Sequence, residues 1–160
     1  MISANAISEL PTAPAIFALI GGAGAGRYVA FVGSAQNLRQ RIRQHLVRRV
    51  SVVAGGKSAV SLNPDYVNEL RWWEHERFAD RAALDAAELV AQETLDPALR
   101  NPLTLNDAAR RVHYKPTFRR SMEALCKGAP TGTLALPNVE EAMERIVALE
   151  RRIAALEERG

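Results

Sequence analysis

The feature that most constrains the fold is a pair of short apolar runs, at residues 15–20 and 27–32, joined by a connector rich in glycine. Apolar runs of this length with a glycine turn between them are typical of two antiparallel strands, so the segment predicts a β-hairpin. Residues 36–49 contain no glycine or proline, and an apolar residue recurs there at every fourth position. That spacing predicts an amphipathic helix directly after the hairpin.

The segments that follow predict one more strand and several helices. Asparagine before proline marks the start of a short helix at residues 64–68, and residues 70–73 form a third apolar run of strand length. Asp80 can cap a long helix that stops at Asp96, and residues 102–127 predict one or two short helices interrupted by a proline. We therefore predict an α/β (α+β) fold with a small three-stranded antiparallel sheet flanked by helices.

Composition places the chain among globular proteins with one core-bearing domain. Of its 160 residues, 48% are hydrophobic and 24% are charged. No apolar run approaches the roughly 20 residues that a membrane helix needs, and the basic-then-apolar start of a secretory signal is missing. Cys126 is the single cysteine, which excludes an internal disulfide and a cysteine-rich zinc site. These features predict a cytoplasmic protein with no membrane partner.

The positive charge of the chain lies in its body rather than at its end. The formal net charge is +3, and residues 139–160 contribute −2, because six glutamates there stand against four arginines. Residues 1–138 therefore carry +5. A basic body favours a polyanionic partner such as a nucleic acid, since neutralising phosphates releases counterions.

Residues 138–160 follow a predicted linker at 128–137 and have heptad order. The a positions are Val139, Ile146 and Ile153, and the d positions are Ala142, Leu149 and Leu156. β-Branched a residues with leucine at two d positions favour two parallel helices, and the g and e positions pair arginine with glutamate across them. We predict a homodimer through residues 138–160. The alternative is that the apolar stripe docks on its own domain.

Residues 51–58 resemble a phosphate-binding loop but lack its context. The glycine-lysine-serine end matches, whereas Ser51 stands at the position of the first glycine. Pro64 leaves no room for the long helix that should face the phosphate. We reject a nucleotide site there and keep Lys57 as a residue that could touch a nucleic-acid backbone.

The predicted helix after the hairpin presents a basic face. Arg41, His45 and Arg48 share this face because they lie about one turn apart. Arg39 and Arg43 flank the apolar stripe on another side. Guanidinium groups match phosphate oxygens, so such a face beside a hairpin could hold a phosphate. The alternative is an ordinary solvated surface helix.

Glu88 has the most unusual predicted position of the acidic residues. It lies between Ala87 and Ala91, on the small-residue face of its helix rather than on the solvent face. A carboxylate there must be paired, bind a cation or face a cleft, because an isolated buried charge is unfavourable. Glu93 on the same helix is the rival acid.

Taken in order, these parts resemble the GIY-YIG nuclease superfamily over residues 11–102. That family has a hairpin with two signature tyrosines, an arginine-bearing helix, a third strand, a helix with one metal-binding glutamate and a later asparagine. The matching residues here are Phe17 and Phe31 at the tyrosine positions, Arg41, His45 one turn later, Trp72 and Trp73 in the third strand, Glu88, and Asn101 after Pro97. The resemblance makes residues 11–102 a nuclease-like domain, followed by a helical extension and linker at 103–137.

The resemblance implies a metal-dependent endonuclease that hydrolyses phosphodiester bonds in DNA, with RNA left open as a partner. It implies that Glu88 holds one Mg²⁺ or Mn²⁺ and that Arg41 contacts the scissile phosphate. His45 would assist, and Asn101 would support the site through hydrogen bonds. Dimerisation would bring two such sites to one substrate. The predicted nucleic-acid contacts around them are Arg39, Arg43, Arg48, Lys57 and Asn101.

Two departures from the family pattern leave further functions open. Phe17 and Phe31 keep the ring volume of the signature tyrosines but cannot accept a proton. Tyr28 lies three residues before Phe31, so regular alternation places it on the other face of the strand unless a bulge intervenes. His45 stays a candidate base, since an unperturbed histidine has a pKa of about 6.5. The alternatives are a pseudonuclease that binds nucleic acid without cutting it, and a coiled-coil adaptor whose globular part binds protein.

Overall fold

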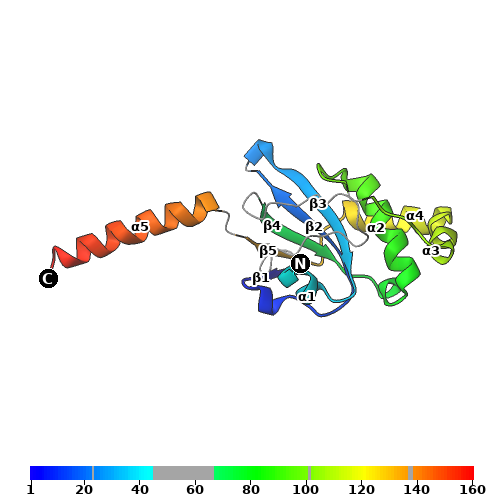
Figure 1. The fold of residues 1–160 in the computed structure, drawn as a ribbon, viewed down its shortest axis with the longest axis horizontal. Coiled ribbons are helices and arrows are strands. Elements are labelled where there is room, and N and C mark those ends of the chain that lie inside the picture. Colours follow the sequence, from blue (N-terminus) through cyan, green and yellow to red (C-terminus); the bar gives the residue numbers. More distant parts are fainter. Residues whose placement is uncertain (23, 45–66, 101, 137–138) are drawn as a thin grey trace.

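A five-stranded mixed sheet forms the centre of the protein (Figure 1). The computed structural model describes residues 1–22, 24–44, 67–100, 102–136 and 139–160. The strands are β1 (Ile2–Ala4), β2 (Ala15–Gly21), β3 (Tyr28–Ala35), β4 (Val67–Trp73) and β5 (Gly132–Ala135). Their order is β1-β5-β4-β2-β3, with β1 parallel to β5 and the other neighbours antiparallel. The predicted α+β class is confirmed, and the three predicted strands are β2, β3 and β4 of a larger sheet.

The two additional strands come from segments without a strand-like pattern. β5 lies within residues 128–137, for which the sequence predicts a linker. Gly132 allows β5 to pair with β4, because a Cβ at this position would lie 2.1 Å from the ring of Trp72. The glycine that suggests a linker is therefore a packing requirement of the sheet. At the start of β4, Val67 and Asn68 belong to the strand, so the predicted short helix is wrong for these two residues.

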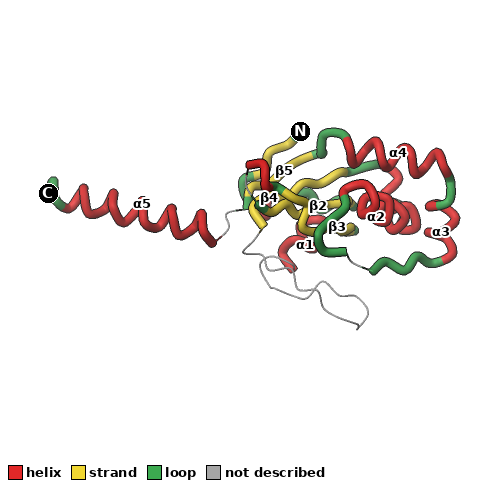
Figure 2. The backbone as a smooth tube through the Cα atoms, turned by 90° about the horizontal axis from the view of Figure 1, so that it is seen from above, coloured by secondary structure: helices red, strands yellow, loops and turns green. Residues whose placement is uncertain are grey.

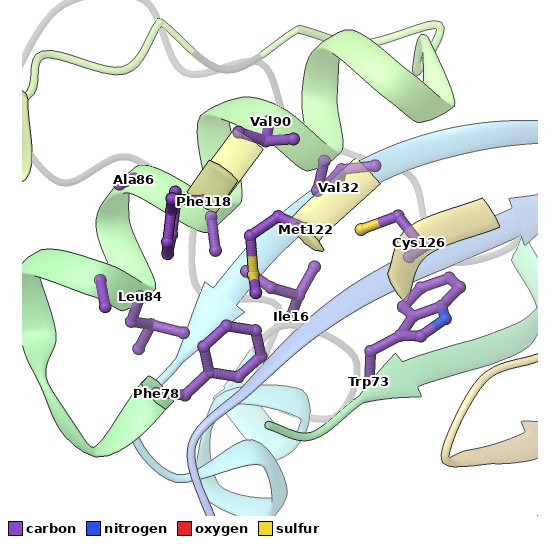
Figure 3. Close-up of a cluster of buried hydrophobic side chains, with 14 of the residues drawn as sticks. Ile16, Val32, Trp73, Phe78, Leu84, Ala86, Val90, Phe118, Met122 and Cys126 are labelled. Carbon is purple, nitrogen blue, oxygen red and sulfur yellow. The ribbon is translucent and has the colours of Figure 1, made fainter. Parts of the chain in front are cut away.

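Helices cover both faces of the sheet (Figure 2). They are α1 (Leu38–Ile42), α2 (Arg81–Leu95), α3 (Asp107–His113), α4 (Pro116–Lys127) and α5 (Val139–Glu157), with short 3₁₀ helices η1 (Ile7–Glu9), η2 (Gly24–Gly26) and η5 (Glu76–Ala79). On the face covered by α2 and α4, Ile16 and Trp73 of the sheet pack in one cluster with Met122 of α4 (Figure 3). On the opposite face, Leu38 of α1 joins the cluster around Phe17.

The two core clusters follow from the alternation of side chains along β2. Ile16, Ala18 and Ile20 belong to the cluster beneath α2 and α4. Phe17 and Leu19 belong to the cluster on the α1 side. Because both faces of the sheet are covered, the strand is apolar at every position instead of alternating with polar residues.

The helices on the first face begin and end where the sequence predicts. Oδ1 of Asp80 accepts a hydrogen bond from the backbone N–H of Ala82 at 3.1 Å and so caps α2. The helix stops at Asp96, which has a positive φ of 46° and precedes Pro97. The predicted break in the next helical segment is confirmed, since α3 ends at His113 and α4 starts with a proline.

A β-bulge interrupts the pairing of β3 with β2. Phe31 and Val29 pair with consecutive residues of β2, which leaves Ala30 as the extra residue. Val29 and Val32 consequently pack against the same core cluster although they lie three residues apart. The bulge reverses the alternation of side chains, so Tyr28 lies on the same face of the strand as Phe31.

α5 projects from the body of the protein with its apolar stripe exposed (Figure 1). Ile146, Leu149, Ile153 and Leu156, at predicted a and d positions, are 48% to 61% exposed. These four side chains are therefore not docked on the described part of the chain. Residue 138, the first of the predicted coiled-coil segment, lies outside the described residues.

Candidate functional site

Glu88 is buried on α2 and hydrogen-bonded to the edge strand of the sheet. The residue is 6% exposed, whereas Glu93 on the same helix is exposed to solvent. The hydroxyl of Ser34 on β3 donates a hydrogen bond to Oε2 of Glu88 at 2.8 Å. The predicted burial of Glu88 is thus confirmed, and Glu93 belongs to the exposed surface of the helix.

The surroundings of Glu88 favour its neutral form. Burial raises the pKa of this carboxyl, and the hydrogen bond from Ser34 acts in the opposite direction. The charge of Asp85 raises the pKa further, and the charge of Arg41 lowers it, with a resulting pKa of about 7. No lysine or arginine of the described residues forms an ion pair or hydrogen bond with Glu88. A carboxyl with this pKa changes its charge near neutral pH, and a nearby cation would favour the ionised form.

Asp85 places a second carboxyl next to Glu88. It lies one helical turn earlier and is half-buried. Burial raises the pKa of Asp85, and the guanidinium of Arg81, 3.9 Å away, offsets part of this effect. Two carboxylates on neighbouring turns repel each other when both are ionised. A cation bound between or beside them would relieve that repulsion.

Arg41 carries a guanidinium close enough to Glu88 to lower the pKa of its carboxyl. It lies on α1, where the side chain of Asn37 caps the helix by accepting a hydrogen bond from the Gln40 N–H at 3.0 Å. Nε of Arg41 is buried and makes no hydrogen bond with any described residue. Its charge lowers the pKa of Glu88, so the two groups interact electrostatically. A buried guanidinium nitrogen in this state is suited to donate to the oxygen of an anion.

The rings of Phe17 and Phe31 meet over Gly33, one residue before Ser34. Their centroids are 6.0 Å apart. A Cβ on Gly33 would lie 2.8 Å from Cζ of Phe17 and 2.9 Å from Cε1 of Phe31, so only glycine leaves room for both rings. Cζ is the atom that carries the hydroxyl in tyrosine. The Phe17 ring therefore ends beside the part of β3 that holds Glu88.

The site is assembled around the edge of the sheet from both of its faces. Phe17 and Phe31 belong to the core cluster on the α1 side, whereas Glu88 reaches Ser34 from the α2 side. β3 lies between them as the edge strand. Backbone N–H groups of residues 98–99 donate hydrogen bonds to this edge nearer its start. The ring contacts at Gly33 and the hydrogen bond at Ser34 lie at neighbouring positions near the other end of the strand.

Tyr28 lies on the same face as the two phenylalanines. Regular alternation predicts the opposite face for Tyr28, but the bulge at Ala30 reverses the alternation before this residue. The residue is 45% exposed at the first position of β3, whereas Ser34 lies near the last. Tyr28 therefore offers a phenol on the appropriate face but toward the far end of the strand.

The other predicted site residues fall into two groups. His45, Arg48, Lys57 and Asn101 lie outside the described residues. Arg39 donates a hydrogen bond from Nε to the carbonyl oxygen of Leu10 at 2.8 Å, so it connects α1 to the N-terminal segment. Arg43 is exposed just after α1 and is accessible to a ligand.

The oxygen groups around Glu88 fit a hard divalent cation. Mg²⁺ typically binds one or two carboxylates, with waters and substrate phosphates as the remaining ligands. Glu88 and Asp85 supply carboxyl oxygens, and the described residues contain no group of three or more His, Cys, Asp or Glu side chains that could hold a metal. Within the described part of the chain, these two carboxyls alone would leave most ligand positions of such a cation unfilled.

Three polar residues of this site were not predicted from the sequence: Ser34, Asp85 and Gln92. Gln92 lies one turn after Glu88, is 5% exposed, and its Nε2 makes no hydrogen bond with any described residue. Helical spacing could have found Asp85 and Gln92, which lie three positions before and four positions after Glu88. Strand alternation could have found Ser34, which lies two residues after Val32 on the α2 face.

No protein family, curated protein or solved structure matches this chain. Within the described ranges, no helix is long and apolar enough to cross a bilayer. The function must therefore be argued from the residues and their chemistry.

Proposed function

We propose that this protein is a divalent-metal-dependent endonuclease that hydrolyses phosphodiester bonds in DNA. The observation that carries the proposal is the buried Glu88, which is held by one hydroxyl and has no cationic hydrogen-bond partner among the described residues. The ionised form of a carboxyl in these surroundings destabilises the fold, so a structural role as a charged residue does not explain it. A bound cation and phosphate would explain Glu88 together with the unpartnered Nε of Arg41. The resemblance to GIY-YIG nucleases supports the same two roles.

Each residue has a defined part in the proposed reaction. Glu88 would hold Mg²⁺ or Mn²⁺, which would supply Lewis-acid stabilisation of the charge on the phosphate oxygens. Arg41 donates hydrogen bonds to a non-bridging oxygen and stabilises the negative charge that develops as water attacks phosphorus. The bond from phosphorus to the departing sugar oxygen breaks, and that oxygen takes up a proton. Ser34 positions the Glu88 carboxylate through its 2.8 Å hydrogen bond.

Two residues are candidates for the base that takes the proton of the attacking water. His45 is proposed from its position one turn after Arg41 in the sequence, because an imidazole titrates near neutral pH. Tyr28 is the second candidate, since the bulge at Ala30 places its phenol on the face of the two phenylalanines. The phenylalanines themselves cannot serve as a base.

Cleavage of DNA tests the proposal directly. The full-length protein is incubated with supercoiled plasmid and with branched DNA, in Mg²⁺ and separately in Mn²⁺. We expect cleavage that Glu88→Ala abolishes and that Glu93→Ala, an exposed acid on the same helix, leaves intact. Absence of cleavage with both metals and both substrates would contradict the proposal.

A nucleic-acid-binding protein that does not cut is the second candidate function. The observation that favours it is the presence of phenylalanine at both tyrosine positions, Phe17 and Phe31. Salt-sensitive binding to DNA or RNA without cleavage would support this pseudonuclease. Lack of affinity for either nucleic acid would favour a coiled-coil adaptor instead.

We further propose that α5 joins two copies of the protein as a parallel coiled coil. The exposed stripe formed by Ile146, Leu149, Ile153 and Leu156 supports this partner. The charge pattern also favours a parallel pair of helices, because Arg152 at a g position can face Glu157 of the second helix at an e position. Light scattering of the full-length chain should give a dimer mass, which Leu149→Asp should reduce to a monomer. A monomeric wild-type protein would contradict the proposal.

A further inference from the structure

The helix pair α3 and α4 carries a dense set of exposed positive charges. Residues 107–127 contain six basic side chains and two acidic ones, a net charge of +4, while the whole chain carries only +3. All six basic side chains are exposed, and we define them as the α3–α4 surface: Arg110, Arg111, Lys115, Arg119, Arg120 and Lys127. Like charges at this density repel one another unless an anionic partner is present.

Most of these charges have no ion-pair partner. Arg110 lies 3.9 Å from Asp107, and Lys127 pairs with Glu123. No acid of the described residues pairs with the other four, which are Arg111, Lys115, Arg119 and Arg120. Elsewhere in the fold, arginines do have structural partners, as with Arg39 and the carbonyl of Leu10.

The fold does not depend on the unpaired charges. Phe118, Met122 and Cys126 hold α4 on the sheet with buried side chains, as Figure 3 shows for this cluster. Ala109 is the buried contact of α3. Since packing fixes both helices, the four basic residues are free to contact a partner.

We propose that the α3–α4 surface is a second nucleic-acid-binding surface, which contacts the phosphate backbone of the same DNA whose cleavage is proposed above. The choice of DNA as ligand rests on that proposed function. Tyr114 supports it, because this ring is 70% exposed in the turn that joins the two helices, between Arg111 and Lys115. Exposed aromatic rings next to basic side chains are typical of surfaces that bind nucleic acids.

An anionic membrane fits this surface less well. A helix that binds membranes presents a large apolar face to the lipid. The apolar face of α4 is buried in the core, and Tyr114 is the one large apolar side chain that residues 107–127 expose. A phosphate backbone requires charge without an apolar face, and its neutralisation releases counterions.

A groove between α2 and α4 borders the surface without being its centre. Arg119, Arg120 and Lys127 line it together with Glu93 and Glu123, so three basic side chains stand against two acidic ones there. Arg110, Arg111 and Lys115 lie outside the groove, on α3 and the turn, so the positive charge extends beyond it. That distribution favours an extended backbone over a small anion in the groove.

The α3–α4 surface and the Glu88 site lie on different sides of α2. Glu88 faces Ser34 on β3, whereas α3 lies beyond α2 from the sheet in both views (Figures 1 and 2). A long duplex is therefore needed to reach both places. The surface would bind phosphates remote from the cleavage point and add affinity without taking part in the chemistry.

Binding as a function of salt tests the proposal on the full-length protein. The ligand is a duplex of about 30 base pairs, which spans roughly 100 Å. We expect Arg119→Gln/Arg120→Gln to weaken binding at least about tenfold at 0.1 M salt and to reduce the slope of log affinity against log salt by about 1 to 2. Arg119→Lys/Arg120→Lys should keep the wild-type slope because it keeps the charge.

A matched control removes the same charge elsewhere. Arg151→Gln/Arg159→Gln, both exposed near the C-terminus, should leave the slope unchanged. Equal effects of the two glutamine variants, or no effect of the α4 variant, would overturn the proposal. So would a wild-type protein without affinity for the duplex, or an α4 variant that loses binding only to phosphatidylserine vesicles.

The two proposals fail in different ways. If Glu88→Ala abolishes cleavage while the α4 variant binds like the wild type, the nuclease proposal is supported and the proposal of a second binding surface is contradicted. If the wild type binds through Arg119 and Arg120 but never cleaves DNA, the second binding surface is supported and the nuclease proposal is contradicted.

Discussion

Two partly or fully buried carboxyls of this protein have opposite surroundings. Glu69 on β4 accepts hydrogen bonds from Arg71, at 2.6 Å, and from Arg27. Burial alone would raise the pKa of Glu69, but the hydrogen bonds and charges of these two arginines outweigh it, so the pKa is lowered. Glu88 accepts a hydrogen bond from Ser34 alone among the described residues, and its pKa is raised to about 7.

The difference separates a structural carboxylate from a candidate functional one. Glu69 is ionised and forms ion pairs with Arg27, which precedes β3, and with Arg71 on β4. Glu88 lies beside a guanidinium that interacts with it only through space, so both groups keep capacity for a ligand. Burial alone does not distinguish the two residues; their partners do.

The largest expected effect on DNA cleavage comes from replacing the arginine near Glu88, compared with replacing an arginine beside Glu69. Arg41→Lys should lower the rate of DNA cleavage about 100-fold or more, because lysine keeps the charge but lacks the planar set of donors that matches a phosphate. Arg71→Lys, beside Glu69, should leave the rate almost unchanged. Steady-state cleavage of a plasmid measures both. Equal losses in the two variants would break the distinction between the sites.

Replacing Glu88 or Glu69 by glutamine should change the stability at pH 8 in opposite directions. The pKa of Glu88 is about 7 in the folded protein against 4.5 in the unfolded chain, so the folded state keeps the proton longer. The stability that this residue contributes is present below pH 4.5 and is lost as the pH rises to about 7. Glu88→Gln should therefore raise the free energy of unfolding at pH 8 by up to about 3 kcal/mol, with little effect at pH 4.5.

The contribution of Glu69 to stability changes with pH in the opposite direction. Its lowered pKa means that its contribution is present above the unfolded pKa and is lost as the pH falls. Glu69→Gln should lower the free energy of unfolding at pH 8 by about 1 kcal/mol, because the partners are partly exposed. Urea unfolding at pH 8 and pH 4.5 measures both variants. A destabilising Glu88→Gln at pH 8 would contradict the account.

Restoring a hydroxyl near the site should have an intermediate effect. Phe31→Tyr is expected to raise the cleavage rate about tenfold, because a phenol can orient or deprotonate the attacking water. Phe78→Tyr, in the core cluster beneath α2, adds a hydroxyl away from Gly33 and should not raise the rate. The cleavage assay used for Arg41 compares them. An unchanged rate in Phe31→Tyr would show that another group activates the water.

The smallest effect is expected for Tyr28→Phe. This variant removes the phenol that the bulge brings to the face of Phe31, and we expect the cleavage rate to fall by less than about tenfold. Tyr114→Phe is the control: it removes a phenol from the turn between α3 and α4 but keeps the aromatic ring assigned to the α3–α4 surface, so it should leave the rate of cleavage unchanged. A rate in Tyr28→Phe identical to that of the wild type would leave His45 as the base.

Local periodicity explains which parts of the fold could be predicted. The hairpin, α2 with its cap at Asp80, and the burial of Glu88 follow from spacings within one segment. β1 and β5 could not be predicted in the same way, because their pairing depends on residues distant in the sequence. The contact of Gly132 with Trp72 is an example, since neither residue indicates the other.

The candidate site shows the same limit. The sequence predicted Arg41 and Glu88 as site residues through their spacing and through a family resemblance. It did not identify the hydrogen bond from Ser34, which joins two elements 54 residues apart. Regular alternation predicted the other face for Tyr28 unless a bulge intervened, and nothing in the local sequence marks Ala30 as the extra residue of that bulge.

Binding of Mn²⁺ at pH 8 tests the central claim most directly, since it needs neither the substrate nor the unidentified base. Electron paramagnetic resonance of the free ion gives the number of ions bound per chain. We expect about one site in the wild type and in Glu69→Gln, and none of comparable affinity in Glu88→Gln. Mn²⁺ binding that is the same in Glu88→Gln as in the wild type would contradict the assignment of Glu88 as the metal ligand.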